Sequence, residues 1–184
     1  MKPQFIIHIF LLVLISGISN AQGVRSTTKA SDFKKTIYTS TVESGNHTTL
    51  ISALEASDIA GILDGDVAFT IFAPSDKAFN KLSGDRMKEL LKPENKKELQ
   101  EVVTYHMVAG NLSASKILRA LDRGKGSATF TTVQGKKIKA TMNGLDIILS
   151  DGFGNKAKIT TADGDQCNGI MHVIDSVFLP EPQK

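Results

Sequence analysis

Three histidines in the body of the chain are the residues best suited to chemistry, and their surroundings favour structural roles. His47 lies at an expected helix start, where we expect it to be exposed to solvent. His106 and His172 lie within apolar segments, where a buried and hydrogen-bonded histidine is the usual outcome. The sequence contains no HExxH, Cys-x-x-Cys or His-x-His, so it carries no local zinc signature.

The sequence also lacks the signatures of nucleophilic catalysis and of nucleotide binding. It has no GxSxG, no P-loop and no GxGxxG. Ser75 precedes an expected helix, which superficially suits a nucleophile, but a helix N-cap accounts for a serine at this position. We therefore expect a protein that is not an enzyme and that needs no cofactor.

Two Asp-Gly-Asp segments invite comparison with a calcium-binding loop. If Asp163 and Asp165 filled the third and fifth positions of an EF-hand loop, Gln166 would replace the required glycine and His172 would replace the final carboxylate. The comparison fails at these positions. This segment and the one at residues 64–66 are predicted to be turns, and no metal site is expected.

Residues 1–21 are typical of a cleavable export signal. Lys2 is followed by an apolar run over residues 5–15, and small residues precede a cleavage site after Ala21. The run is shorter than the roughly 20 residues that span a bilayer. We expect a secreted or periplasmic protein, and an uncleaved anchor is the alternative.

The charge and cysteine content narrow the possible partners. Of 22 basic and 19 acidic residues, cleavage removes one basic residue, which leaves 21 and 19 and a net charge of +2. This balance does not predict nucleic-acid binding.

Cys167 is the one cysteine, so no internal disulfide can form; we expect a free thiol, with an intermolecular disulfide as the alternative. Asn46 and Asn111 lie in glycosylation sequons, which matter only in a eukaryotic source, and the short signal and missing disulfides favour a bacterial one.

The elements that must position these residues change in type along the chain. Residues 22–35 are predicted to be a flexible leader and the start of the first helix, residues 36–180 a single domain, and residues 181–184 a polar tail. Apolar residues recur at helical spacing in the first half and alternate in the second half, where Asn143-Gly144 predicts a hairpin with a type I′ turn. The pattern indicates an α+β fold rather than a parallel doubly wound one.

Two segments combine several local signals. Residues 69–82 begin with an alternating strand that includes Thr70 and Phe72 and ends at Pro74. Ser75, Asp76 and Phe79 then predict a helix with a cap, a negative charge in its first turn and an apolar face. Residues 168–180 begin with the turn Asn168-Gly169 and continue as a strand that includes His172 and ends at Pro180.

Together with Tyr105-His106, these two segments resemble the conserved boxes of the fasciclin (FAS1) family, in the family's order. The resemblance covers about residues 36–179. It implies a β-sandwich-like core of two sheets, with helices packed against it mostly from the N-terminal half, and it implies that the two boxes pair as neighbouring strands.

The resemblance also implies a function in adhesion. It suggests a non-enzymatic extracellular or periplasmic binding module, monomeric, that contacts a protein or polysaccharide of a cell surface, matrix or envelope. Tyr105, His106 and Asp163 are the candidate binding residues it implies, although Gly164 stands where the family's aspartate-isoleucine pair has isoleucine. The alternative is a carrier of an apolar lipid or pigment in a groove beside the first box.

Overall fold

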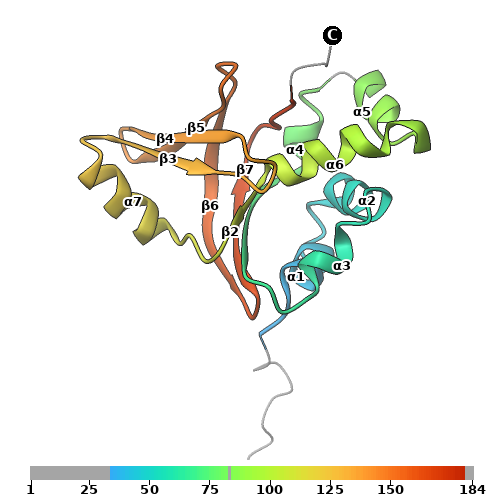
Figure 1. Cartoon of the computed structure of the whole chain (residues 1–184), viewed down its shortest axis with the longest axis horizontal. Helices are drawn as coiled ribbons and strands as arrows, with labels where there is room; N and C mark the ends of the chain where they lie inside the picture. The colour runs from blue at the N-terminus through green and yellow to red at the C-terminus, as the bar shows by residue number, and fades with distance from the viewer. Residues whose placement is uncertain (1–33, 83, 181–184) are drawn as a thin grey trace, which may run out of the picture. The chain divides into compact units, whose positions relative to one another are not determined.

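The computed structural model describes residues 34–82 and 84–180, and the predicted signal, most of the leader and the polar tail lie outside these residues. Within this part, seven strands form a sheet in the order β2-β1-β7-β6-β5-β4-β3 (Figure 1). Their bounds are β1 (Phe69–Pro74), β2 (Met107–Ala109), β3 (Ser127–Thr131), β4 (Lys137–Asn143), β5 (Asp146–Ser150), β6 (Lys156–Gln166) and β7 (Gly169–Ile174). The expected α+β fold is confirmed.

The two expected sheets are halves of this one sheet, because the long strand β6 pairs with both β5 and β7. The two edges also approach one another. Val108 in β2 forms an isolated bridge with Thr132, just after β3, and the Val133 N–H donates to the Met107 carbonyl at 2.8 Å. The sheet therefore nearly closes on itself around an apolar interior.

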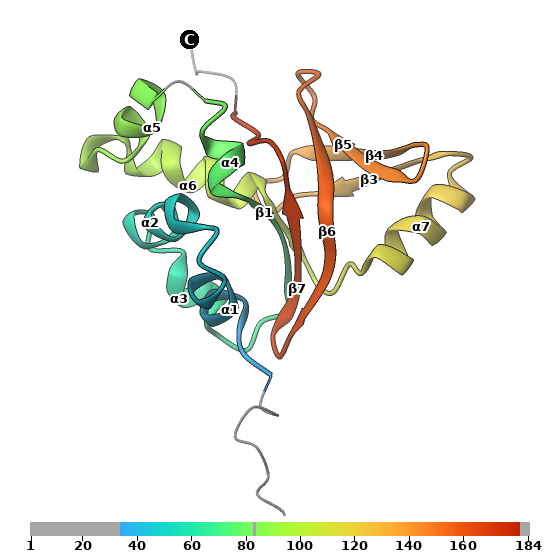
Figure 2. The same cartoon turned by 180° about the vertical axis from the view of Figure 1, so that it is seen from behind.

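Helices in the first half cover the outside of β1 and β7 (Figures 1 and 2). They are α1 (Ile37–Glu43), α2 (Thr48–Ala56), α3 (Ala60–Leu63), α4 (Asp76–Phe79), α5 (Gly84–Leu90), the 3₁₀ turn η1 (Pro93–Asn95) and α6 (Lys96–Tyr105). The seventh α-helix, α7 (Ala114–Arg123), lies beside β3. No helix in the described part of the chain is both long and apolar enough to cross a bilayer.

The alternation of side chains along the strands separates two apolar clusters. Ile71 and Ala73 of β1 face helices α1–α6 and join the first cluster, whereas Phe72 faces the sheet interior and joins the second. Both faces of β1 are buried, which explains its nearly continuous apolar sequence. Phe178 lies beyond β7 and is fully buried in the second cluster, and β7 ends at Ile174 rather than at the expected Pro180.

The two family boxes pair as neighbouring strands, as the resemblance implied. β1 and β7 run parallel, with Phe69 opposite Gly169 and Phe72 opposite His172. Gly169 has a φ of +154°, and a Cβ atom there would lie 1.9 Å from the Phe69 carbonyl oxygen. Glycine is therefore required where the two strands begin.

Two expected turns differ from the structure. Asn143 pairs with Asp146, so the central residues of the β4–β5 turn are Gly144 and Leu145 rather than Asn143 and Gly144. Gly144 alone of these has a positive φ, of +60°, as in a type II′ turn, so the expected type I′ turn is wrong. The predicted turn at Asp163 is a bulge within β6, where register shifts fall on both sides of Thr161.

Candidate functional site

His106 and the aromatic residues around it form the centre of the candidate site. His106 follows α6 and is 2% exposed. Its Nδ1 lies 2.8 Å from the Val102 carbonyl oxygen, and its Nε2 accepts a hydrogen bond of 3.0 Å from the Phe178 N–H. These partners require the neutral tautomer with the proton on Nδ1, because only that tautomer donates at one position and accepts at the other.

Burial makes this neutral state persistent. It lowers the pKa of His106 to about 4, and the hydrogen bond to the Val102 carbonyl opposes the shift only in part. The imidazole also packs against the Phe178 ring, with centroids 5.6 Å apart. His106 therefore fastens the C-terminal segment to the end of α6, and neither of its nitrogens is left for a ligand.

Tyr105 lies beside His106 and is 1% exposed. Its ring is 6.0 Å from that of Phe178. Burial and the negative charge of Asp151 raise the pKa of Tyr105, so its hydroxyl stays protonated. Because Tyr105 and His106 are both covered, a partner on the surface would meet the segments that they hold in place rather than their rings.

His172 is a second buried histidine, and both of its ring nitrogens have hydrogen-bond partners within the protein. It is fully buried, stacks on Phe72 with centroids 5.7 Å apart, and lies 2.8 Å through Nε2 from the Leu112 carbonyl oxygen. Its Nδ1 accepts from the Asp163 N–H at 3.2 Å. Burial lowers its pKa, against the opposing effects of the Leu112 carbonyl and the Asp163 charge.

Asp163 connects this buried ring to the surface. It is exposed, has a φ of +58°, and its Oδ1 accepts from the N–H of Ala114, the first residue of α7, at 2.7 Å. A carboxylate at a helix N-terminus is stabilising. Of the three candidate binding residues, Asp163 alone is exposed, and it lies on a different element from Tyr105 and His106.

Thr70 supports the same region from β1. Its buried hydroxyl donates to the Gly110 carbonyl at 2.6 Å and accepts from the Leu112 N–H at 2.7 Å. Leu112 in turn receives the hydrogen bond from His172. Thr70 and His172, from the two family boxes, therefore fix the loop that leads into α7.

The residues after β1 cap two helices. Ser75 accepts from the Ala78 N–H at 3.3 Å and caps α4, as expected. Asp76 lies in the first turn of α4, but its carboxylate accepts from the N–H groups of Thr48 and Thr49 at 3.1 and 2.9 Å and so caps α2. His47, the N-cap residue of α2, makes no side-chain cap hydrogen bond of its own.

The expectation that His47 is exposed is wrong. It is 2% exposed, and its Nδ1 lies 2.9 Å from the Pro74 carbonyl oxygen at the end of β1. No local pattern indicates this contact, because the residues beside His47 are polar and Pro74 lies 27 residues further along the chain. Phe79 is buried among the helices, as its predicted apolar position requires.

Asn168 joins the second box to the first helices. Its Oδ1 accepts from the Ile37 N–H at 2.8 Å, and its Nδ2 donates to the carbonyls of Leu63 and Gly65, each at 2.7 Å. The adjacent Cys167 is exposed and has a free thiol. Most of the motif residues thus make contacts within the protein that stabilise the fold.

Within the described residues, no group of three or more histidine, cysteine, aspartate or glutamate side chains could hold a metal ion. The apolar cavity beside Pro74, Phe79 and His106 measures about 10 Å³. That is about the volume needed for a single water molecule.

The fold and these contacts define a FAS1-type domain, and comparison with known proteins gives the family. The fasciclin domain profile matches residues 45–180, so the chain belongs to the fasciclin domain family. The FAS1 domain pair of the insect cell adhesion molecule Fasciclin I has the same fold, with a TM-score of 0.70 over 80% of this chain and 51% of that one, at 19% identity.

The relatives are bacterial and animal. Protein sll1483 of Synechocystis sp. is 36% identical over 142 residues, which cover 76% of this chain and 71% of the relative. Human periostin is 30% identical over 72% of this chain but only 14% of its own length. Immunogenic protein MPB70 of Mycobacterium bovis is 30% identical over 61% of this chain and 50% of the relative. The bacterial relatives agree with the bacterial source expected from the sequence.

Proposed function

We propose that this protein is a non-enzymatic binding module, extracellular or periplasmic, that acts in adhesion or in contact with a matrix, an envelope or a host surface. The supporting observation is that the two histidines suited to catalysis, His106 and His172, are closed off from a substrate. Both His106 and His172 use both ring nitrogens in internal hydrogen bonds and are buried. General acid–base catalysis needs a titratable group that can reach a substrate, and these two groups cannot.

Asp163 is the proposed direct contact. Its carboxylate is exposed at the N-terminus of α7, and the φ of +58° fixes its direction. Tyr105 and His106 are proposed to support binding from beneath, by holding Phe178 and the C-terminal segment in place. A partner that binds the surface beside α7 would thus depend on Tyr105 and His106 without contacting them.

Binding of the purified protein to cells, matrix and envelope fractions tests this function. Asp163→Asn removes the charge but keeps an oxygen that can accept from Ala114, and asparagine tolerates a positive φ. We expect weaker binding with unchanged folding. Asp122→Asn, at an exposed position of α7, is the control. A folded wild-type protein that binds none of these fractions would contradict the proposal.

The alternative function, a carrier of an apolar lipid or pigment, has less support. Its groove was expected beside the first box, where the apolar cavity of about 10 Å³ is far too small for such a ligand unless the helices separate. Mass spectrometry of protein purified from its native source distinguishes the two functions. A bound lipid or pigment in a fixed ratio would favour the carrier.

A further inference from the structure

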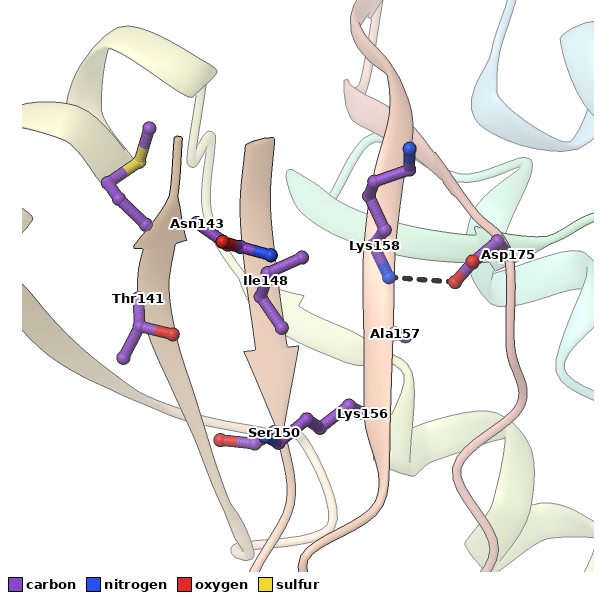
Figure 3. A pocket seen from close by; sticks show the side chains of 9 residues that line it. Thr141, Asn143, Ile148, Ser150, Lys156, Ala157, Lys158 and Asp175 are labelled. Carbon is purple, nitrogen blue, oxygen red and sulfur yellow. Dashed lines mark hydrogen bonds between the residues drawn. The ribbon is translucent and has the colours of Figure 1, made fainter. Parts of the chain in front are cut away.

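Two hollows on the outer surface of the sheet meet at Asp175. One measures about 450 Å³ and is lined by parts of β4, β5 and β6, including Lys156 and Lys158 (Figure 3). The other measures about 700 Å³ and lies between the start of α4 and strands β6 and β7, with Lys77 and Lys81 in its wall. Because Asp175 lines both, the two hollows adjoin at this residue, and we call the pair the lysine trough.

The strand register explains why lysines gather there. Along β6, Ala157 and Ile159 are buried in the sheet interior, so Lys156 and Lys158 point to the outer face. Lys156 lies opposite Ser150, and Ser150 lies opposite Lys139 in the next strand. These three residues form a row across the sheet, with strands about 5 Å apart.

The positive charge of the trough is cancelled only in part by nearby carboxylates. Within the described part of the chain, Lys77 and Lys156 have no carboxylate at ion-pair distance, and Lys81 and Lys158 pair at 3.4 Å with Asp175 and Asp146. Asp175 accepts from the Lys158 N–H at 2.7 Å, as the dashed line in Figure 3 marks.

Asp76, the other carboxylate that lines the trough, also accepts hydrogen bonds from within the protein, as Asp175 does. Its two oxygens accept from Thr48 and Thr49. Four lysines therefore face three carboxylates, namely Asp76, Asp175 and the Asp146 that pairs with Lys158, which leaves a net charge of +1 (4 − 3) along the trough.

The rest of the lining suits a carbohydrate. Hydroxyl groups of Thr141, Ser150, Thr160 and Thr161 line the two hollows. The half-buried side chain of Ile148 adds an apolar patch. Hydroxyl partners for sugar hydroxyls, an apolar patch for a sugar ring and lysines for its acidic groups are thus combined in the two adjoining hollows.

We propose that the lysine trough binds a linear acidic polysaccharide that carries carboxylate groups. This inference rests on the proposed binding function and specifies the chemistry of the partner. Lysine ammonium groups attract carboxylates as point charges, and two adjoining hollows favour a chain over a compact anion. The contact is expected to weaken as salt screens the exposed charges.

Calorimetric titration of the purified protein with an oligogalacturonate of uniform length tests the inference, with a neutral glucan of similar length as the reference. We expect binding to the oligogalacturonate alone, weaker at higher ionic strength. The double variant Lys77→Gln/Lys156→Gln should lose roughly tenfold in affinity, because two surface charge pairs with the ligand are lost and each contributes modestly. These two lysines are chosen because both are exposed and neither forms an ion pair within the described residues.

The matched control is Lys88→Gln/Lys97→Gln, which removes the same charge from exposed positions of α5 and α6. Equal loss in both variants would overturn the inference, because it would reflect net charge alone. Backbone amide shifts of the wild-type protein provide a second readout, and we expect them at Ser150, Lys156 and Thr160. Shifts confined to α5 and α6 would also overturn it.

The rival partners and the proposed function remain distinguishable. Tighter binding to single-stranded DNA or to vesicles of anionic phospholipid than to the oligogalacturonate would overturn the polysaccharide assignment. A wild-type protein that binds envelope or matrix fractions but not the oligogalacturonate would overturn this inference and leave the proposed function standing. Failure to bind any of them would overturn both.

Discussion

Asp76 caps a helix that begins 28 residues before it in the chain, since its Oδ2 accepts from the N–H and the hydroxyl of Thr48 at 3.1 and 2.9 Å. The contact ties α2 to the residues that follow β1. His47 strengthens the same junction through the Pro74 carbonyl. The end of the first box therefore fixes helices before and after it, which gives Asp76 a larger role than one in its own short helix.

Replacing Asp76 should destabilise the protein. Asp76→Ala is expected to cost about 1–2 kcal/mol in the free energy of unfolding, because the cap of α2 is lost. Urea denaturation at neutral pH measures the effect. Asp85→Ala, in the first turn of α5 with a fully exposed side chain, is the control and should change stability by less than about 0.5 kcal/mol. Equal losses would show that the α2 cap carries no special stability.

The same cap gives stability an acid dependence. Partial burial opposes ionisation of Asp76, but the hydrogen bonds from Thr49 and Thr48 outweigh it and lower its pKa. The folded pKa lies below the unfolded one, so the contribution is present above about pH 4 and is lost as the pH falls through the folded pKa. Asp76→Asn should therefore show a shallower loss of stability than the wild type in the acid range. Parallel curves for the two proteins would contradict this prediction.

The lowered pKa of His106 predicts a second loss of folding stability, which begins at a higher pH than the loss from Asp76. Its folded pKa of about 4 lies below the usual 6.5, so the unfolded chain takes up a proton first as the pH falls. Stability is fully present above about pH 6.5 and declines towards pH 4, by about 3 kcal/mol at most from a shift of this size. Denaturation curves at several pH values measure this, and His106→Gln should remove most of the slope. His172, whose pKa is also lowered, contributes in the same direction.

Truncating His106 should also be costly at neutral pH. His106→Ala leaves the Phe178 N–H and the Val102 carbonyl without their buried partner. We expect a loss on the order of 1–3 kcal/mol from the unpaired groups. The melting midpoint and the binding assay should be measured together. An unchanged midpoint with lost binding would show a direct functional contact instead of a structural one.

Gly169 should tolerate no side chain. A Cβ atom would lie 1.9 Å from the Phe69 carbonyl oxygen and 2.7 Å from Ile37 Cδ1, so β1 and β7 would have to separate at their start. Gly169→Ala is expected to cost roughly 3 kcal/mol or more, at or above the upper end of overpacking effects. Gly61→Ala, in α3 with nothing within 4 Å, is the control and should be neutral or slightly stabilising. Thermal melts of both variants provide the comparison.

Sequence patterns were sufficient where the physics is local. The Ser75 cap of α4 depends on neighbours within a few residues, and the structure has it. The expected turn Asn168-Gly169 lies one residue earlier, because Gln166 pairs with Gly169. Alternation and helical spacing likewise indicated helices in the first half and strands in the second. The motif order was enough to suggest the family.

The tertiary structure decided the contacts between distant segments. Asn168 bonds Ile37 across 131 residues, and His106 bonds Phe178 across 72. No local pattern specifies such partners, because packing of the core chooses them. The same reason explains why His47 is buried and why one residue separates the observed β4–β5 turn from the expected one.

The lysines of the trough show most clearly what local sequence patterns determine and what long-range packing determines. Alternation along β6 places Lys156 and Lys158 on the same face, but it does not decide which elements border that face. Folding brings Lys77 and Lys81, which lie about 75 residues before Lys156 in the chain, to the same trough. The sequence by itself determined the family, the order of the elements and the local caps. Only packing over long sequence separations decided which polar residues are buried and which lie together on the surface.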